Sequence, residues 1–427
     1  MHPLLRLPYR ALALAADAIA HTPIGGAGKV GHSLRARRGA VERLSTWAAV
    51  HRDPSRPLLW MHAPSVGEGL QARPVLERVR ALRPELQVVY THFSPSAERF
   101  AASLGADVAD YLPFDRVAHA RALLDALRPT ALVFSKVDVW PMLTETAAAR
   151  GVRLGLISAT MAAGSARRGT LARALTRDAF AALDAIGAVD EADAGRLVAA
   201  GARRERISVT GDTRYDQVAA RAAAADRAGT LLAPLHSERP TLVAGSTWPA
   251  DERVLFPAWL DVRREVPDAR LIVVPHEPIA AHLEPIRRWA AGASLSIATL
   301  DAARPEHDVV LVDRVGVLGD LYAVADAAYV GGGFHAAGLH SVLEPAAFGA
   351  PVLFGPRHHA SRDARLLLDC AGAVVVDDAA SLARALRIVL TEPDTRGRAG
   401  TSARALVQQG LGAADRSATL VERLLSA

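Results

Sequence analysis

The stretch from Gly331 to Gly355 reads GGGFHAAGLHSVLEPAAFGAPVLFG and follows the apolar run AYV. An apolar run, a glycine-rich turn, a short helix and a second apolar run form the pattern of one unit of a parallel α/β sheet. The glycines let the backbone approach a ligand closely, and a helix beginning near Ser341 directs unpaired N–H groups at an anion. Glu344, one turn into that helix, has two acceptor oxygens suited to a ribose diol. The stretch predicts a nucleotide site.

Apolar runs of strand length alternate with helical segments on both sides of a central region without strand pattern, Tyr215 to Pro240. The first series is LLWMHA, QVVYTHF, ALVFS, RLGLISAT, AIGAVD and RISVTGD; the second is TLVAGST, RLIVVPH, DVVLVD, AAYVGGG, PVLFG and AVVVD. This alternation predicts two doubly wound, Rossmann-like α/β domains, with a cleft between them and ligands outside the carboxyl ends of the strands. We expect an N-terminal helix in residues 1–30, domains at 31–216 and 217–400, and a C-terminal helix at 401–427.

The composition is that of a folded protein of 427 residues, half of them apolar. Its single cysteine, Cys370, excludes an intramolecular disulfide and is consistent with a reducing compartment. Between Arg6 and Arg56, nine basic residues stand against three acidic ones, which favours an anionic membrane as partner. No cluster of base-stacking aromatic residues accompanies this charge, so no nucleic acid is expected.

The first twenty residues, MHPLLRLPYRALALAADAIA, are too often interrupted by charge for a membrane-spanning helix. They predict an interfacial amphipathic helix. A secretory signal is disfavoured by the short apolar core and by Asp17. An ordinary first helix packed on the domain is the remaining alternative.

Three residues of the first domain follow strand candidates and carry groups suited to proton transfer. Glu68, in the loop PSVGEG before a helix expected near Leu70, is able to take a proton from an attacking hydroxyl, or only to complement the helix dipole. Lys136 is one of only two lysines among 50 basic residues, and Asp138 follows it in SKVDVWP. The lysine is suited to supporting a developing negative charge, with a salt bridge to Asp138 as the alternative.

Other polar candidates follow later strands. Arg214 in GDTRYD is suited to binding phosphate or to linking the domains, and Ser246 and Thr247 to holding phosphate or to capping a helix. The clustered histidines near the opening stretch lack a metal-binding spacing. Gly331, Gly333 and Ala336 match the dinucleotide pattern, but no acid follows PVLFG, which speaks against a nicotinamide-dependent oxidoreductase.

Taken together, these segments resemble the 3-deoxy-D-manno-octulosonic acid (Kdo) transferases that act on the lipid A precursor. The resemblance rests on motifs in the same order along most of the chain: HAPSVGE, THFSPS, YLPFD, KVDVWP, ISAT, GDTRYD, AGSTWPADE, VPHEP, LVDRVGVLGDLYAVADAAYVGGGF and HSVLEPAAFGAPVLFGP. It implies a two-domain GT-B fold, CMP-Kdo as donor, lipid IVA as acceptor, inversion at the anomeric carbon and no cofactor or nucleotide-bound metal. It also implies peripheral or monotopic attachment to the cytoplasmic face of the inner membrane.

The resemblance also implies roles for individual residues. Glu68 corresponds to the general base, Arg214 to a basic residue supporting the transition state, and Lys136 to Asp138 to a segment that has glutamate in many members. The implied donor contacts are Pro275, His276, Val315, Gly316, Val317, Ser341 and Glu344, and the residue pattern adds Ser246, Thr247, Gly332 and Gly333 as donor-binding candidates. His276 replaces a common arginine and Ser341 a common asparagine. The alternatives are a transferase or epimerase using a UDP-sugar, the oxidoreductase, and a non-enzymatic membrane-surface protein.

Overall fold

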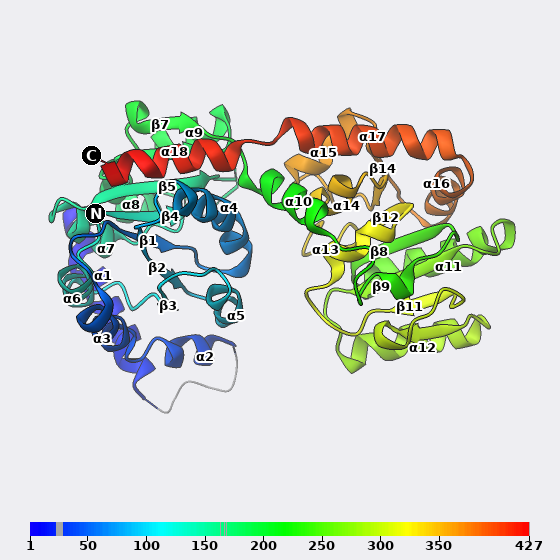
Figure 1. Ribbon diagram of the computed structural model, residues 1–427, viewed down its shortest axis with the longest axis horizontal. Helices are drawn as coiled ribbons and strands as arrows, with labels where there is room; N and C mark the ends of the chain where they lie inside the picture. The colour runs from blue at the N-terminus through cyan, green and yellow to red at the C-terminus, as the bar shows by residue number, and fades with distance from the viewer. Residues whose placement is uncertain (23–28, 163, 166, 168, 427) are drawn as a thin grey trace. The chain divides into compact units, whose positions relative to one another are not determined.

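The computed structural model describes residues 1–22, 29–162, 164–165, 167 and 169–426. Residues 23–28 of the expected N-terminal segment, and the side chain of Lys29, lie outside the described part. The chain divides into two compact units, unit 1 (1–217 with 412–427) and unit 2 (218–411). Within the described residues, each unit contains one seven-stranded parallel sheet with helices on both faces (Figure 1). The predicted fold class, two doubly wound α/β domains, is confirmed.

The sheet of unit 1 has the strand order β3-β2-β1-β4-β5-β6-β7. Its strands are β1 (Leu58–His62), β2 (Gln87–His92), β3 (Val108–Tyr111), β4 (Ala131–Ser135), β5 (Arg153–Ala159), β6 (Ala185–Ala188) and β7 (Ile207–Val209). Its helices are α1 (Pro3–Ala20), α2 (Lys29–Ala36), α3 (Ala40–His51), α4 (Val66–Leu82), α5 (Glu98–Ala102), α6 (Val117–Leu127), α7 (Pro141–Ala148), α8 (Thr170–Ala181), α9 (Glu191–Ala200), the start of α10 (Thr213–Ala224) and α18 (Ala413–Ser426).

The central strands β1, β2 and β4 of this sheet are buried along their whole length because both faces are covered. In β1, Leu58 and Trp60 join a core with α3, α6, α7 and α8 on one face. Leu59 and Met61 alternate with them and join a second core with α4 and α18 on the other. A continuous apolar run in the sequence therefore marks a doubly covered parallel strand.

The sheet of unit 2 has the order β10-β11-β9-β8-β12-β13-β14. Its strands are β8 (Thr241–Thr247), β9 (Arg270–Pro275), β10 (Ile297–Thr299), β11 (Val309–Leu311), β12 (Ala327–Val330), β13 (Val352–Phe354) and β14 (Ala373–Val375). Its helices are α11 (Pro249–Glu265), α12 (Ala280–Gly292), α13 (Leu318–Leu321), α14 (Leu343–Phe348), α15 (Arg362–Asp369), α16 (Ala379–Thr391) and α17 (Pro393–Gln409).

The segment 401–427, expected as one helix, consists of the end of α17 and the whole of α18. Helix α18 returns to unit 1 and lies along α4 over the sheet (Figure 1). Asp216 holds its start by accepting hydrogen bonds from the backbone N–H groups of Gly412 (2.9 Å) and Ala414 (3.0 Å). Leu424 packs onto Gly155 of β5 so closely that a Cβ at Gly155 would lie 2.6 Å from the leucine. Helix α18 is thus part of the core of unit 1.

Helix α1 contacts unit 1 through polar side chains and exposes an apolar stripe. The Tyr9 hydroxyl donates to Asp115 (2.6 Å), and Arg6 forms an ion pair with Glu145 (2.6 Å). The stripe follows helical spacing, with Leu4, Leu7, Leu12 and Ile19 exposed by 80%, 75%, 69% and 50%. In the described part of the chain, no helix combines the length and apolar character needed to cross a membrane.

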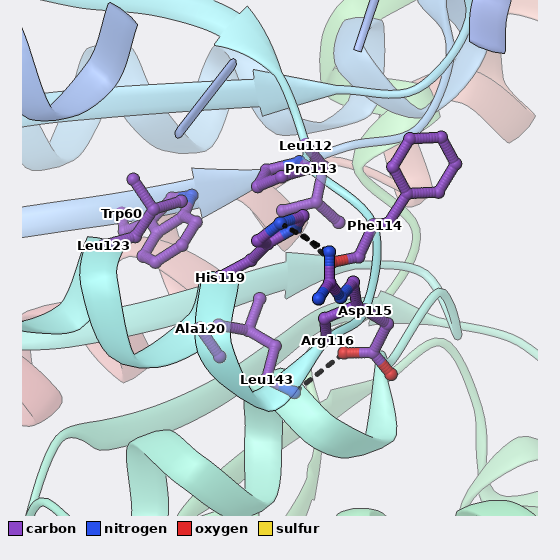
Figure 2. A pocket seen from close by; sticks show the side chains of 10 residues that line it. All are labelled: Trp60, Leu112, Pro113, Phe114, Asp115, Arg116, His119, Ala120, Leu123 and Leu143. Carbon is purple, nitrogen blue, oxygen red and sulfur yellow. Dashed lines mark hydrogen bonds between the residues drawn. The ribbon is translucent and has the colours of Figure 1, made fainter. Parts of the chain in front are cut away.

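The loop after β3 connects α1 to the rest of unit 1. Asp115 also accepts a hydrogen bond from the backbone N–H of Leu143 in α7 (2.8 Å), and a small cavity lies beside this loop (Figure 2). The Phe114 ring points away from Trp60 and His119, which line the cavity (Figure 2). Asp115 thus anchors α1 and α7, whereas its neighbour Phe114 directs its ring away from Trp60 and His119.

Several further sequence-based expectations differ from the structure. The pattern does not predict β3 and β10, which are short, partly exposed edge strands without a continuous apolar run. Helix α4 begins at Val66, so Glu68 lies in its first turn instead of a loop. Gly69, taken as a loop residue, is required by packing, because a Cβ there would lie 2.3 Å from the Phe100 ring. Helix α14 begins at Leu343, two residues after Ser341.

Candidate active site

The structure brings Glu68 and Lys136 together at the carboxyl edge of the unit 1 sheet. Glu68 lies in the turn of α4 that follows β1, and Lys136 directly follows β4, the neighbour of β1 in the sheet. Their side chains form an ion pair, with 3.5 Å between Lys136 Nζ and Glu68 Oε1. The Ser65 hydroxyl donates to the other carboxylate oxygen, and the Ser135 hydroxyl donates to the Glu68 backbone carbonyl (3.2 Å). The Glu68 side chain remains 21% exposed, so it is accessible to an incoming hydroxyl.

The backbone of Lys136 has φ of 60°, in the left-handed region that non-glycine residues rarely occupy. The strand-like hydrogen bond from its N–H to the Ile157 carbonyl (2.8 Å) holds this conformation. Such backbone strain is found most often at functional sites, where the surrounding structure fixes a side chain that the chemistry needs.

The salt bridge of Lys136 is formed with Glu68 and not with Asp138, the neighbouring acid that the sequence suggested as its partner. Its carboxylate accepts from His62 Nε2 (3.2 Å) and the Trp140 indole (3.1 Å), and it forms an ion pair with Arg167 (3.0 Å). Burial acts to raise the pKa of Asp138, but the His62 hydrogen bond and the Arg167 charge outweigh it and lower that pKa below the ordinary value. Asp138 is therefore ionised at neutral pH and holds His62, the last residue of β1, and Trp140, which precedes α7.

Arg214 lies in the first turn of α10, in unit 1. Its guanidinium binds Asp212 through Nε (2.9 Å) and Nη2 (2.6 Å). The side chain is 38% exposed, and the paired aspartate orients the guanidinium. Pairing with a carboxylate does not prevent an exposed arginine from contacting a second anion.

The glycine-rich turn of unit 2 is compact because backbone atoms of other segments lie very close to its glycines. A Cβ at Gly331 would lie 2.2 Å from the Ser246 carbonyl, and one at Gly333 would lie 2.4 Å from the Gly355 nitrogen. Asp251 of α11 organises the turn by accepting from the backbone N–H of Gly332 (2.8 Å) and of Phe334 (3.1 Å). The turn is therefore a rigid structure at the carboxyl edge of β12.

Ser246 and Thr247 follow the same edge at the end of β8. Ser246 has φ of 53°, and the Thr247 hydroxyl donates to Glu252 (3.0 Å). Neither caps α11, because the N-cap position of that helix is Trp248, whose backbone N–H donates to Asp251 (3.0 Å).

An aromatic cluster surrounds Trp248. The indole stacks with His335 (4.2 Å between ring centroids) and His276 (4.5 Å), and its Nε1 donates to His340 Nε2 (3.1 Å). His276 directly follows β9 and Pro275 and is exposed, so this cluster places an imidazole at the predicted donor site.

Glu344 lies in α14 close to the charges of Arg221 and Asp320. Burial raises the pKa of Glu344, while Arg221 acts to lower it. Arg221 binds Asp320 (2.9 Å) and donates to the Gly316 carbonyl (3.0 Å). This arginine ties the turn Val315–Val317, which exposes Val315 by 76%, to α10, and its charge acts on Glu344. Ser341 precedes α14 and is exposed.

Sequence reasoning missed several residues that the structure places around these groups. His62 ends β1, and Ser65 lies three residues before Glu68. Both could have been predicted from the sequence, because they lie at or just after the end of an apolar run. The same holds for Trp248 after β8. Arg221 gave no such signal, because it lies in an Ala- and Arg-rich helix without a motif. The described residues contain no group of three or more His, Cys, Asp or Glu side chains able to hold a metal ion.

Two doubly wound domains in one chain, each with polar residues at the carboxyl edge of its sheet, define the GT-B class of fold. A solved structure of UDP-GlcNAc 2-epimerase from Neisseria meningitidis bound to UDP-GlcNAc matches with a TM-score of 0.60 and 14% identity, covering 87% of this chain and 100% of that one. At this identity the likeness concerns the fold alone.

Sequence comparisons assign the family. A family model for 3-deoxy-D-manno-octulosonic-acid transferase (kdotransferase) matches residues 32–217. The 3-deoxy-D-manno-octulosonic acid transferase of Chlamydophila psittaci is 30% identical, over 80% of this chain and 79% of that protein. The enzyme of that name from Bordetella pertussis is 31% identical, over 85% and 86%. The chain belongs to the Kdo transferase family and is thus a glycosyltransferase.

Proposed function

We propose that the chain transfers Kdo from CMP-Kdo to a lipid A precursor, lipid IVA, with inversion at the anomeric carbon and without a separate cofactor. The observation that carries the proposal is the Glu68–Lys136 pair at 3.5 Å on the carboxyl edge of a parallel sheet, in a chain of this family.

In the proposed mechanism, Glu68 is the general base. Its carboxylate removes the proton of an acceptor hydroxyl as that oxygen attacks the anomeric carbon and the bond to the CMP phosphate breaks. The Ser65 hydroxyl and Lys136 hold the carboxylate in one orientation. Asp138 is engaged by His62, Trp140 and Arg167, so Asp138 is proposed as a positioning residue and not as the base.

CMP leaves as an anion, and positive charge lowers the free energy of that state. Lys136 and Arg214 are the proposed basic groups in unit 1. In unit 2, the carboxyl edge supplies the donor contacts, with Glu344 as the ribose acceptor and Gly332, Gly333, Ser246 and His276 near the phosphate. Arg221 supports this arrangement by fixing the Gly316 turn.

The exposed stripe of α1 supports attachment of the enzyme to the anionic cytoplasmic face of the inner membrane. Its leucines are unpartnered within the described structure, while the polar side of α1 is bound to unit 1. An interfacial helix in this orientation lies flat on a bilayer and places the acceptor-binding unit beside a lipid substrate.

The test is transfer by the purified full chain from CMP-Kdo to lipid IVA in detergent, read by mass spectrometry, with UDP-N-acetylglucosamine as the control donor. We expect a product heavier by whole Kdo units and none with the UDP-sugar. The product linkage, read by NMR, is expected to be inverted relative to the donor. If product forms with UDP-N-acetylglucosamine and not with CMP-Kdo, the proposed donor is wrong and the chain uses a UDP-sugar.

A further inference from the structure

A groove of about 530 Å³ lies in unit 1 between α18 and the edge strand β7. Helix α18 packs on β4, β5 and β6, and the groove extends beyond it along β7. Arg206 directly precedes β7 and Thr210 directly follows it, and both line the groove, which therefore runs the length of the strand. Small-molecule sites in proteins have volumes of roughly 300–1,000 Å³, so this groove has room for one small ligand.

Four arginines line the groove and come from three parts of the chain. Arg153 begins β5, Arg206 precedes β7, and Arg416 and Arg423 belong to α18. The two arginines of α18 are seven residues apart, so they lie on one side of the helix, about two turns from each other. Two residues of the lining are acidic, so the four arginines give the groove an excess of positive charge.

The acidic residues of α18 are engaged away from the groove. Glu422 forms an ion pair with Arg83 (2.7 Å), directly after α4, and Asp415 forms one with Arg78 of α4. Arg423 is exposed on the groove side, and its side chain makes no hydrogen bond or ion pair with any described residue. The acids of its own helix therefore do not neutralise Arg423.

The remaining arginines also keep their charge available to the groove. The side chain of Arg153 is exposed and, within the described residues, has no hydrogen bond or ion pair. Arg206 Nη1 donates to the Asp184 backbone carbonyl (3.4 Å), and Arg416 Nε donates to the Thr210 backbone carbonyl (2.8 Å). A neutral carbonyl orients a guanidinium but does not cancel its charge.

The groove is separate from the groups proposed to act in catalysis. Arg153 and Arg206 lie at the amino ends of β5 and β7, whereas Glu68 and Lys136 lie at the carboxyl edge of the same sheet. All strands of this sheet are parallel, so these are opposite edges. A ligand in the groove therefore does not occupy the place of the acceptor hydroxyl.

We propose that this groove binds a small polyphosphate anion at a site distinct from those of the sugar donor and the acceptor. The inference does not depend on the proposed function. Guanidinium groups bind phosphate oxygens through paired N–H donors, and the exposed Ser208 of β7 adds a hydroxyl donor to the lining. The two acids of the lining, Asp184 and Glu205, weaken the attraction for a monoanion, so an anion with several charges close together is favoured. A phosphate carries more charge per group than a carboxylate, which favours a polyphosphate.

The test measures binding of inorganic triphosphate to the full chain by isothermal titration calorimetry, at an ionic strength held constant with sodium chloride. Arg153→Met and Arg423→Met are compared with the wild type and with a control, Arg99→Met, which removes one exposed arginine of the same unit outside the groove. We expect each groove variant to raise Kd roughly 10- to 100-fold, the effect of losing charged hydrogen bonds, and the control to bind like the wild type. The proposal is wrong if the wild type does not bind triphosphate, or if both groove variants bind it as tightly as the wild type.

Thermal unfolding separates loss of the ligand from loss of the fold. Both arginines are exposed and make no side-chain ion pair with the described residues, so without ligand each variant should melt within about 2 °C of the wild type. Triphosphate should raise the melting temperature of the wild type and of Arg99→Met more than that of the double variant Arg153→Met with Arg423→Met. An equal rise in all of these proteins would place the bound anion outside the groove and overturn the proposal.

Two competing ligands test the location of the site and the class of anion. The Kd for triphosphate should be the same with and without saturating CMP, whereas displacement by CMP would assign the anion to the proposed donor site instead. Citrate, titrated at the same ionic strength, should bind more weakly than triphosphate. Tighter binding of citrate that depends on Arg153 and Arg423 would replace the polyphosphate with a polycarboxylate and so overturn the assignment.

Discussion

Replacing Glu68 with glutamine should separate the role of this residue in catalysis from its role in the fold. Glutamine keeps the size of the side chain and an acceptor for the Ser65 hydroxyl, but it cannot take a proton. General-base catalysis typically contributes about 10²- to 10⁴-fold to a rate, equivalent to roughly 3–5 kcal/mol of activation free energy. We expect kcat to fall within this range while KM for both substrates changes little.

The effect of this substitution on stability should be much smaller. At 3.5 Å, the attraction between Glu68 and Lys136 is about 1 kcal/mol at the dielectric constant of water. The two side chains are 21% and 33% exposed, so screening keeps the net value near that of a surface ion pair, about 1 kcal/mol or less. For a unit of this size, the corresponding fall in melting temperature is roughly 2–4 °C.

The assay is a time course of Kdo transfer to lipid IVA at saturating donor, with melting temperatures measured on the same preparations. Lys136→Met provides a matched comparison, because it breaks the same ion pair but leaves the carboxylate. The reasoning is refuted if Glu68→Gln keeps more than about a tenth of the wild-type kcat, a smaller loss than general-base catalysis supplies. Because Lys136 is itself proposed to stabilise the leaving CMP, this variant tests the stability estimate, and its melting temperature should fall by roughly the same 2–4 °C.

Three further predictions concern the donor site, the membrane and pH. Glu344→Gln should weaken inhibition by CMP roughly tenfold, and an unchanged inhibition constant would remove the proposed ribose contact. Leu7→Asp with Leu12→Asp should shift the protein from the pellet to the supernatant in sedimentation with phosphatidylglycerol vesicles, whereas Val50→Asp, an exposed apolar residue outside the stripe, should not. Burial, followed by the charge of His276, lowers the pKa of His340 to about 4 from 6.5. Between these two pKa values, the unfolded chain binds a proton at His340 and the folded protein does not. The free energy of unfolding should therefore fall by about 2–3 kcal/mol as the pH is lowered from 6.5 to 4. In His340→Gln, this contribution to the pH dependence of the free energy of unfolding should be absent.

The sequence predicts most strands because parallel sheets covered on both faces need continuous apolar runs. The run LLWMH, for example, coincides with β1. The strands that escaped prediction, β3 and β10, lie at sheet edges, where half-exposed positions accept polar residues and the pattern disappears.

Candidate site residues could be placed at strand ends, but their partners could not. Lys136 and Asp138 are two residues apart, and local spacing suggested that they pair. The strand order instead places β4 beside β1, so Lys136 meets Glu68 and Asp138 meets His62.

The return of α18 to unit 1 affects how the protein is assembled and dissected. Unit 2 is one continuous segment, 218–411, whereas the core of unit 1 needs residues that are synthesised after all of unit 2. During translation, the apolar face of α4, β4 and β5 that Leu424 and its neighbours cover stays open until that late segment emerges. Unit 2 can therefore complete its fold first. A fragment meant to represent unit 1 should join residues 1–217 to 412–427 through a linker, because cutting the chain at 217 would leave part of its core exposed to water.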